Sequence, residues 1–132
     1  MTQAIVFKFF LHTRHMKLQR DALLLRIFLG EDDELEGEFV FRKVVLKARE
    51  MNLAGATVLR GPLGFGRSSF LHASAVFRVS EDLPIVIEIV DTEDKIQNFL
   101  AEVEGILGAG LITLEKVQAI FYKAKSAKTR GP

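Results

Sequence analysis

The sequence predicts a single α+β domain with a ferredoxin-like βαββαβ sandwich, in which two helices cover one face of an antiparallel sheet. Three observations support this fold class. Short apolar runs and amphipathic segments follow one another in the order strand, helix, strand, strand, helix, strand. The 132 residues suffice for one hydrophobic core but not for two. No linker-like segment separates the predicted elements, so we expect one domain.

The first strand is predicted at Ala22–Leu29, a short apolar run that lies between Asp21 and the acidic turn Gly30–Asp33. The acidic stretch Glu31–Glu38 is expected to lead into a helix, because negative charge suits the positive end of the helix dipole. Within Glu38–Asn52, apolar residues recur at helical spacing and basic residues lie largely on the other side. This pattern predicts an amphipathic helix.

The middle of the chain predicts two further core strands and a long connection between them. Ala56–Arg60 is strand-like, and Gly61–Gly66 then breaks the strand. Phe70–Val79 alternates apolar and polar side chains, which predicts an extended hairpin arm. Leu83–Val90 follows as a buried strand with Pro84 near its start.

The last two elements are a helix and a strand. The pair Asp91-Thr92 is expected to cap a helix at Glu93–Leu107, whose apolar residues form one stripe. Gly108 can end this helix. Leu111–Tyr122 supplies the final strand.

Two predicted core strands are apolar on both sides. Leu24 and Phe28 alternate with apolar neighbours in the first strand, and Val86 and Val90 do so in the third. Because two helices cover only one face of the sheet, the other face of a monomer should be polar. The pattern therefore predicts that another surface covers the open face, and self-association is the simplest source of it.

Charge is unevenly distributed along the chain. Residues 1–15 carry two bases and residues 123–132 carry four, with no acid in either segment. The body, residues 16–122, therefore holds 12 bases and 17 acids, a net charge of −5. This balance argues against nucleic-acid binding. We expect residues 123–132 to be a basic flexible tail.

Residues 1–15 are expected to lie outside the core domain at 16–122, either as an N-terminal extension or as an added edge strand. The apolar stretch Ala4–Leu11 is far shorter than the roughly 20 residues that span a bilayer, so the protein is not expected to be membrane-embedded. Cysteine is absent, which excludes disulfides and cysteine zinc sites and is compatible with a cytoplasmic location.

A glycine-rich loop between the second and third core strands is the candidate ligand site. Glycines allow the backbone to approach a ligand closely, successive amides can bind an anion, and arginines add bidentate donors. The loop is neither a phosphate-binding P-loop nor a dinucleotide-binding turn. A plain turn between strands remains the alternative interpretation. The candidate residues are Arg60, Gly61, Gly64, Phe65, Gly66 and Arg67.

Glu88 interrupts a buried strand, and a carboxylate placed there needs a partner. It is expected either to form an ion pair with Arg26 or Arg78 or to contact a ligand in a cleft. His72 lies on the polar side of the arm, where an exposed imidazole is commoner than a catalytic base. No catalytic set, paired carboxylates or metal-ligand spacing is evident, so we expect no enzymatic activity and no metal site.

Four segments together resemble a widespread prokaryotic PII-like family of unknown function, the domain of unknown function one-ninety. They are Leu25–Asp33, Gly55–Gly61, Gly64–Gly66 and Leu83–Asp91. The resemblance extends over residues 16–122. A more distant similarity links Gly64-Phe65-Gly66-Arg67 to the base of the T-loop of PII signalling proteins.

The resemblance implies a homotrimer that binds adenine nucleotides (ADP, ATP or AMP) in the clefts between subunits. It also implies a T-loop counterpart that docks onto a membrane transporter or channel, or onto a regulated enzyme. The expected partner-loop residues are Ser68, Ser69, His72 and Arg78. The B-loop counterpart, Gly108–Ile112, departs from PII because it lacks the Gly-Lys-rich phosphate-binding sequence. A smaller or differently placed ligand is therefore an open alternative.

The expected function is that of a regulatory or signalling protein. It would sense a small anionic ligand between subunits and act on a partner protein through a mobile loop. The alternative is a non-catalytic trimeric interaction or scaffold module without a nucleotide ligand.

Overall fold

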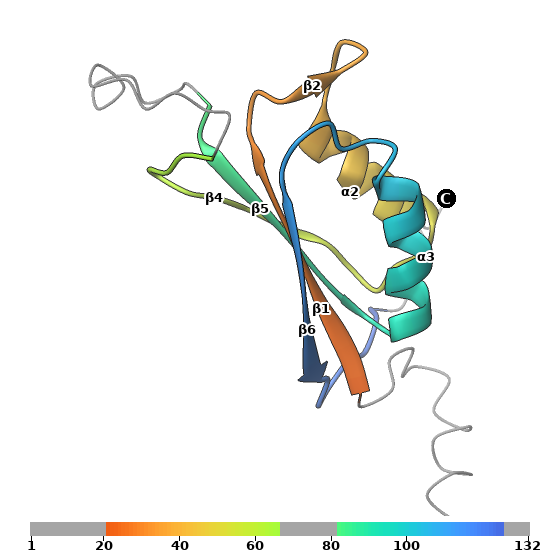
Figure 1. Cartoon of the computed structure of the whole chain (residues 1–132). Coiled ribbons are helices and arrows are strands. Elements are labelled where there is room, and N and C mark those ends of the chain that lie inside the picture. The colour runs from red at the N-terminus through yellow and green to blue at the C-terminus, as the bar shows by residue number, and fades with distance from the viewer. Residues whose placement is uncertain (1–20, 67–81, 126–132) are drawn as a thin grey trace, which may run out of the picture.

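The computed structural model describes residues 21–66 and 82–125. Its main sheet has four antiparallel strands in the order β4-β5-β1-β6. Both helices lie on one side of this sheet, and the other side is open (Figure 1). The elements are β1 (Asp21–Gly30), β2 (Glu34–Leu35), β3 (Glu38–Phe39), α2 (Val40–Glu50), β4 (Thr57–Arg60), β5 (Pro84–Asp91), α3 (Glu93–Val103) and β6 (Leu111–Gln118).

The predicted βαββαβ order is confirmed. The first and third core strands, β1 and β5, pair at the centre of the sheet, and β4 and β6 form its edges. This strand order is that of the ferredoxin-like fold. The arm predicted at Phe70–Val79 lies outside the described residues, as do residues 1–15 and most of the basic tail.

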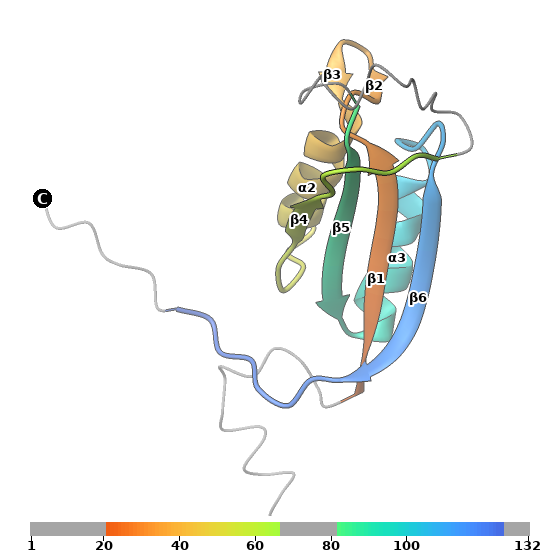
Figure 2. The same ribbon diagram turned by 90° about the vertical axis from the view of Figure 1, so that its left-hand side faces the viewer.

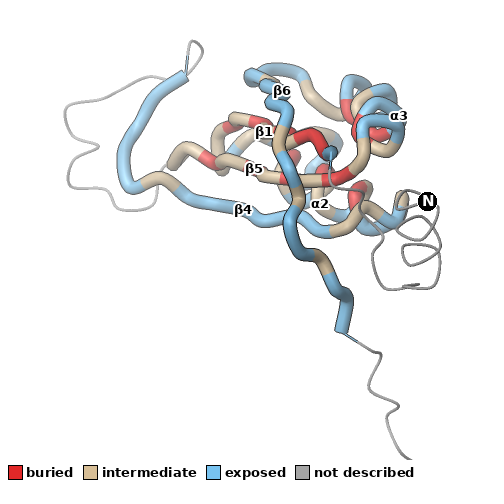
Figure 3. Tube along the Cα trace, turned by 90° about the horizontal axis from the view of Figure 1, so that it is seen from below, coloured by how far each residue is buried: buried red, intermediate tan, exposed pale blue. Residues whose placement is uncertain are grey.

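The core lies between the sheet and the two helices. Alternate residues of β1 and β5 point toward the helices and are almost fully buried, because successive side chains of a strand face opposite sides. The helices bury the apolar stripe that their spacing predicted (Figure 3). The largest buried side chains include Leu25, Ile27, Ile85, Ile87, Ile89, Ile96 and Phe99.

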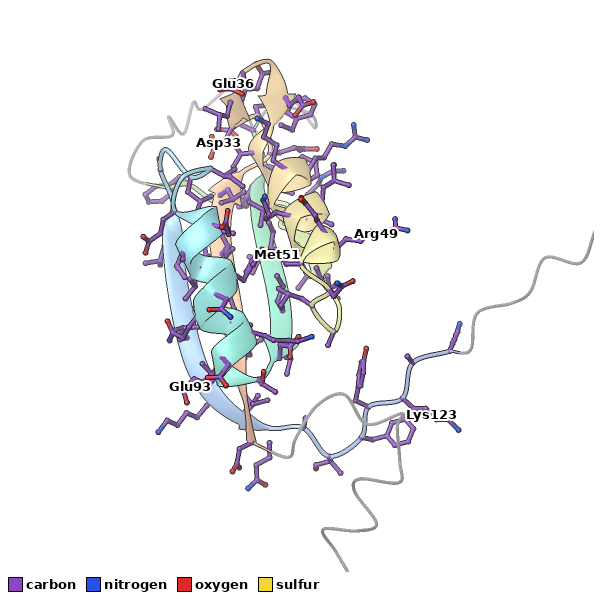
Figure 4. The ribbon with its side chains drawn as sticks, turned by 90° about the vertical axis from the view of Figure 1, so that its right-hand side faces the viewer. Asp33, Glu36, Arg49, Met51, Glu93 and Lys123 are labelled. Carbon is purple, nitrogen blue, oxygen red and sulfur yellow. The ribbon has the colours of Figure 1, made fainter. Side chains whose placement is uncertain are left out.

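The acidic stretch Glu31–Glu38 leads into a helix as predicted, since α2 begins at Val40, but its acids do not lie in the first turn of that helix. This stretch contains the two-stranded hairpin β2-β3, and the first turn of α2 holds no acidic residue. Glu36 and Gly37, at the hairpin tip, both have positive φ angles, 54° and 80°, as a two-residue type I′ turn requires (Figure 4). Lys43 of α2 instead faces two of the acids from the side, 3.6 Å from Glu36 and 3.8 Å from Glu38.

The start of α3 differs from the predicted cap. The side chain of Thr92 makes no capping hydrogen bond. The carboxylate of Asp91, which is buried, accepts hydrogen bonds from the backbone N–H groups of Thr92, at 2.7 Å, and Ala54, at 2.8 Å. Asp91 therefore ties the start of α3 to the loop between α2 and β4.

The ends of the last two elements come earlier than predicted. Helix α3 ends at Val103 rather than Leu107, and β6 ends at Gln118 rather than Tyr122. Beyond β6 the chain leaves the sheet and passes the lower end of β1 in Figure 2. This segment, residues 119–122, is called the strap below.

Replacing Asp91 with alanine is expected to destabilise the fold by about 2 kcal/mol, because two backbone N–H groups lose their acceptor. Asp94→Ala, on the exposed first turn of the same helix, is the matched control and should change stability by less than about 0.5 kcal/mol. Urea denaturation at one protein concentration measures both values. Equal stability of the two variants would contradict the anchoring role of Asp91.

Candidate functional site

Three turns that carry glycine meet at the end of the sheet where β1 stops and β6 begins. They are Gly30–Asp33, which starts at the last residue of β1, Gly64–Gly66 after β4, and Ala109–Leu111, which ends at the first residue of β6. Together with Asp82 and Pro84 at the start of β5, they enclose a hollow of about 590 Å³. We call this feature the glycine hollow.

The glycine-rich loop packs closely against the start of β5. The N–H of Gly61 donates to the carbonyl of Pro84 at 2.8 Å. A Cβ atom on Gly61 or Gly64 would come within 2.8 or 3.0 Å of Pro84 Cγ. The glycines at these two positions therefore allow the loop to lie directly against the proline ring, which brings Gly64 into the wall of the hollow.

The opposite wall depends on Gly110. Its φ angle is +135°, a region that residues with a side chain rarely adopt. A Cβ atom there would come within 2.7 Å of the carbonyl oxygen of Phe28. Glycine at this position thus allows the turn before β6 to approach β1.

Carboxylates form the third side of the hollow. Asp33 accepts a hydrogen bond from the N–H of Gly30 at 3.0 Å. Asp32 and Asp82 each accept from the other's backbone N–H, at 3.1 and 3.3 Å. These bonds join the turn after β1 to the start of β5 and fix acidic side chains at the edge of the hollow.

The structure brings together some of the candidate ligand residues and separates others. Gly64, Phe65 and Gly66 line the glycine hollow. Arg60 forms an ion pair with Glu31 and is not part of the lining. Gly61 is also not in the lining, and Arg67, Ser68, Ser69, His72 and Arg78 lie outside the described residues.

Glu88 lies on the open face, away from the glycine hollow. Its carboxylate accepts a hydrogen bond from Arg26 Nε at 3.1 Å, so the predicted ion pair is made with Arg26. Arg26 also pairs with Glu115 at 3.3 Å. The hydrogen bond from Arg26 to Glu88 raises the pKa of the guanidinium above its ordinary value.

An apolar row crosses the same face beside this polar pair. The strand register places Leu59 opposite Val86, Val86 opposite Phe28, and Phe28 opposite Leu111. Because burial alternates along β1 and β5, these four side chains lie on the side of the sheet away from the helices. That face of the sheet is turned toward the viewer in Figure 2. The prediction that the strands are apolar on both sides is therefore confirmed in the sheet itself.

A second hollow, of about 750 Å³, lies between the strap and the beginning of β4. Tyr122 Oη donates a hydrogen bond to the carbonyl of Ala54 at 2.9 Å and holds the strap in place. Ile120 and Phe121 of the strap are more than four-fifths exposed. The sequence had indicated only a strand end here.

Other proteins have sequences similar to this chain. The family model described as "DUF190: Uncharacterized ACR, COG1993" matches residues 22–119. The chain belongs to this family. A UPF0166 protein of Aquifex aeolicus is 42% identical over 98 residues, covering 74% of this chain and 92% of that protein. A UPF0166 protein of Methanocaldococcus jannaschii is 35% identical over 94 residues, covering 70% and 86%.

Solved structures similar to this DUF190 protein include PII-like proteins. A putative PII-like signaling protein from Thermus thermophilus superposes with a TM-score of 0.53 at 14% identity, covering 76% of this chain and 90% of that one. CPII from Thiomonas intermedia K12, bound to ADP, AMP and acetate, gives 0.53 at 17% identity, covering 75% and 88%. These likenesses confirm the PII-like fold.

Two kinds of feature are absent from the described part of the chain. Within residues 21–66 and 82–125, no helix is both long and apolar enough to span a bilayer. In the same residues, no three histidine or acidic side chains are grouped so that they could hold a metal ion.

Proposed function

We propose that this DUF190 protein is a PII-like regulatory protein that binds an adenine nucleotide, or a related small anion, at the glycine hollow. It would act on a partner protein through the segment 67–81, which follows Gly66 of the hollow lining and contains the arm predicted at Phe70–Val79. The observation that carries this proposal is the meeting of Gly64–Gly66 with Ala109–Leu111 in one hollow. In PII proteins, which the chain resembles, adenine nucleotides bind at the T-loop base and the B-loop, and Gly64–Gly66 and Ala109–Leu111 would be the counterparts of these two loops.

The lining suits a nucleoside. Phe28, Phe65, Pro84 and Leu111 provide apolar surface for a base, and Phe65 is largely exposed. Glycines on two sides leave backbone groups accessible for hydrogen bonds with polar ligand atoms. The solved CPII structures hold ADP and AMP, which supports this ligand class for a chain of the same fold.

We further propose that the protein is a cytoplasmic homotrimer in which the open sheet faces meet. The row formed by Leu59, Val86, Phe28 and Leu111 supports self-association, because an apolar row of this kind gains stability when it is removed from water. The number three rests on the resemblance to PII proteins. Trimer formation would place each glycine hollow near a cleft between subunits.

The partner would be a membrane transporter or channel, or a regulated enzyme, and the proposed role is binding rather than catalysis. A scaffold without a nucleotide is the second candidate. One observation favours it: in the described lining of the hollow, the charged residues are Asp33 and Asp82, both acidic. Carboxylates repel phosphate, so the ligand must be tested directly.

Calorimetric titration of the purified oligomer with AMP, ADP and ATP tests the proposal. We expect binding by at least one nucleotide at micromolar to submillimolar concentration. Ala109→Phe should reduce affinity at least about tenfold, because the new ring occupies the hollow. Ala101→Phe, the same change on the exposed surface of α3, is the matched control and should bind like the wild type. Absence of binding at millimolar nucleotide would favour the scaffold.

A further inference from the structure

The charged residues in the described lining of the glycine hollow are both acidic. They are Asp33 and Asp82, and Glu31 and Asp32 lie in the adjoining turn. Arg60 forms an ion pair with Glu31 and does not line the hollow. Arg67 follows Gly66 in the sequence and lies outside the described residues, so this balance concerns the described lining alone.

The two carboxylates are held in position by the backbone. Asp33 is bonded to the N–H of Gly30 and Asp82 to the N–H of Asp32. A Cβ atom on Gly30 would lie only 2.3 Å from Asp82 Oδ1, which shows how closely this carboxylate approaches the end of β1. Neither carboxylate can turn away from an incoming ligand without breaking these bonds.

The turn before β6, on the other side of the hollow, contains no basic residue that could offset the charge of these carboxylates. Between Gly108 and Tyr122 the single basic residue is Lys116. Lys116 lies in β6 opposite Leu23, whereas the hollow begins at Leu111, opposite Phe28. The lysine is therefore five residues along the strand from the site.

We infer that the glycine hollow selects adenine compounds of low negative charge and binds adenosine or AMP more tightly than ATP. This inference rests on the proposed function and names the ligand class more narrowly. Each added phosphate charge is repelled by two fixed carboxylates, whereas the neutral base and ribose are not. Selectivity thus arises from Asp33 and Asp82, while the apolar and glycine surfaces supply affinity.

Calorimetry on the wild-type oligomer with adenosine, AMP and ATP, in the absence and presence of Mg²⁺, tests this preference. We expect ATP to bind at least about tenfold more weakly than AMP at low ionic strength. Added salt should reduce the difference, because it screens the repulsion between phosphates and carboxylates. This salt response needs no variant and is unaffected by any loss of folding.

The double variant Asp33→Asn, Asp82→Asn identifies the source of the selectivity. Asparagine keeps an oxygen that accepts the backbone hydrogen bonds but removes the charge. We expect the AMP-to-ATP affinity ratio to fall at least about fivefold, with adenosine affinity unchanged. The control Asp21→Asn, Asp94→Asn changes two exposed acids elsewhere and should leave the ratio as in the wild type.

The outcomes separate the two proposals. If ATP binds as tightly as AMP, with or without Mg²⁺, or if the double variant leaves the ratio unchanged, the charge-based selectivity is wrong while nucleotide binding stands. If adenosine, AMP and ATP all fail to bind, the proposed ligand class is wrong, and the selectivity inference falls with it.

Discussion

Replacing Leu59 and Leu111 together with glutamate is expected to convert the oligomer into a monomer. These leucines lie at the two ends of the apolar row on the open face and are 48% and 58% exposed in the single chain. The monomer therefore tolerates a polar side chain at either position. In an assembly that buries the row, each substitution loses about 1.5–3 kcal/mol of apolar burial and places an unpaired carboxylate in the interface.

Light scattering coupled to gel filtration at micromolar concentration measures the effect. The wild type should have the mass of three chains, and the double variant the mass of one. Leu46→Glu is the matched control, because Leu46 is 63% exposed on α2, on the other side of the sheet. The control should remain trimeric. A monomeric wild type, or a trimeric double variant, would show that the open face is not the interface.

The periodic elements were predictable because their burial is decided locally. In β5, Ile87 and Ile89 alternate with Glu88 and Val90, and the structure buries the isoleucines against the helices. In α3, Ile96 and Phe99 are spaced for one face, and both are fully buried. The two-sided apolar character of β1 and β5 also followed from the sequence, since each side of a strand can be inspected separately.

The features that were missed depend on contacts between distant parts of the chain. Tyr122 donates a hydrogen bond to the carbonyl of Ala54, 68 residues away, and no local sequence pattern predicts this contact. The pairing of Arg60 with Glu31 is likewise made by the fold, and the role of Arg60 as an anion ligand stays a prediction. The acidic stretch Glu31–Glu38 leads into α2 as predicted, but the β2-β3 hairpin within it, with positive φ angles at Glu36 and Gly37, was not predicted.

The candidate site was predictable in part. The sequence drew attention to Gly64–Gly66 because clustered glycines mark a special backbone, and these residues line the hollow. The contribution of Asp33 and Asp82 could not be foreseen, because they are 49 residues apart and meet only through the paired ends of β1 and β5. Predicting the electrostatic character of a site therefore requires the fold, whereas its glycine content can be predicted from the sequence.

Gly110→Val is expected to damage both the fold and the proposed site. Valine is strained at the φ angle of +135° that Gly110 adopts, and its Cβ would clash with the carbonyl oxygen of Phe28 at 2.7 Å. The turn before β6 must then move away from β1. We expect a loss of about 3 kcal/mol in stability and at least about tenfold weaker binding of any ligand in the glycine hollow.

Gly108→Val is the matched control for this change. Gly108 lies two residues earlier in the same turn, a Cβ atom added to it would meet no heavy atom within 4 Å, and its φ angle is not strained. Thermal unfolding and calorimetry of both variants at one concentration should therefore show a large loss of stability and ligand affinity for Gly110→Val and a small loss for Gly108→Val. Because both variants add the same side chain to the same turn, a difference between them reports the contact with Phe28 rather than the loss of glycine flexibility. Equal effects would mean that the approach of Gly110 to β1 does not shape the hollow.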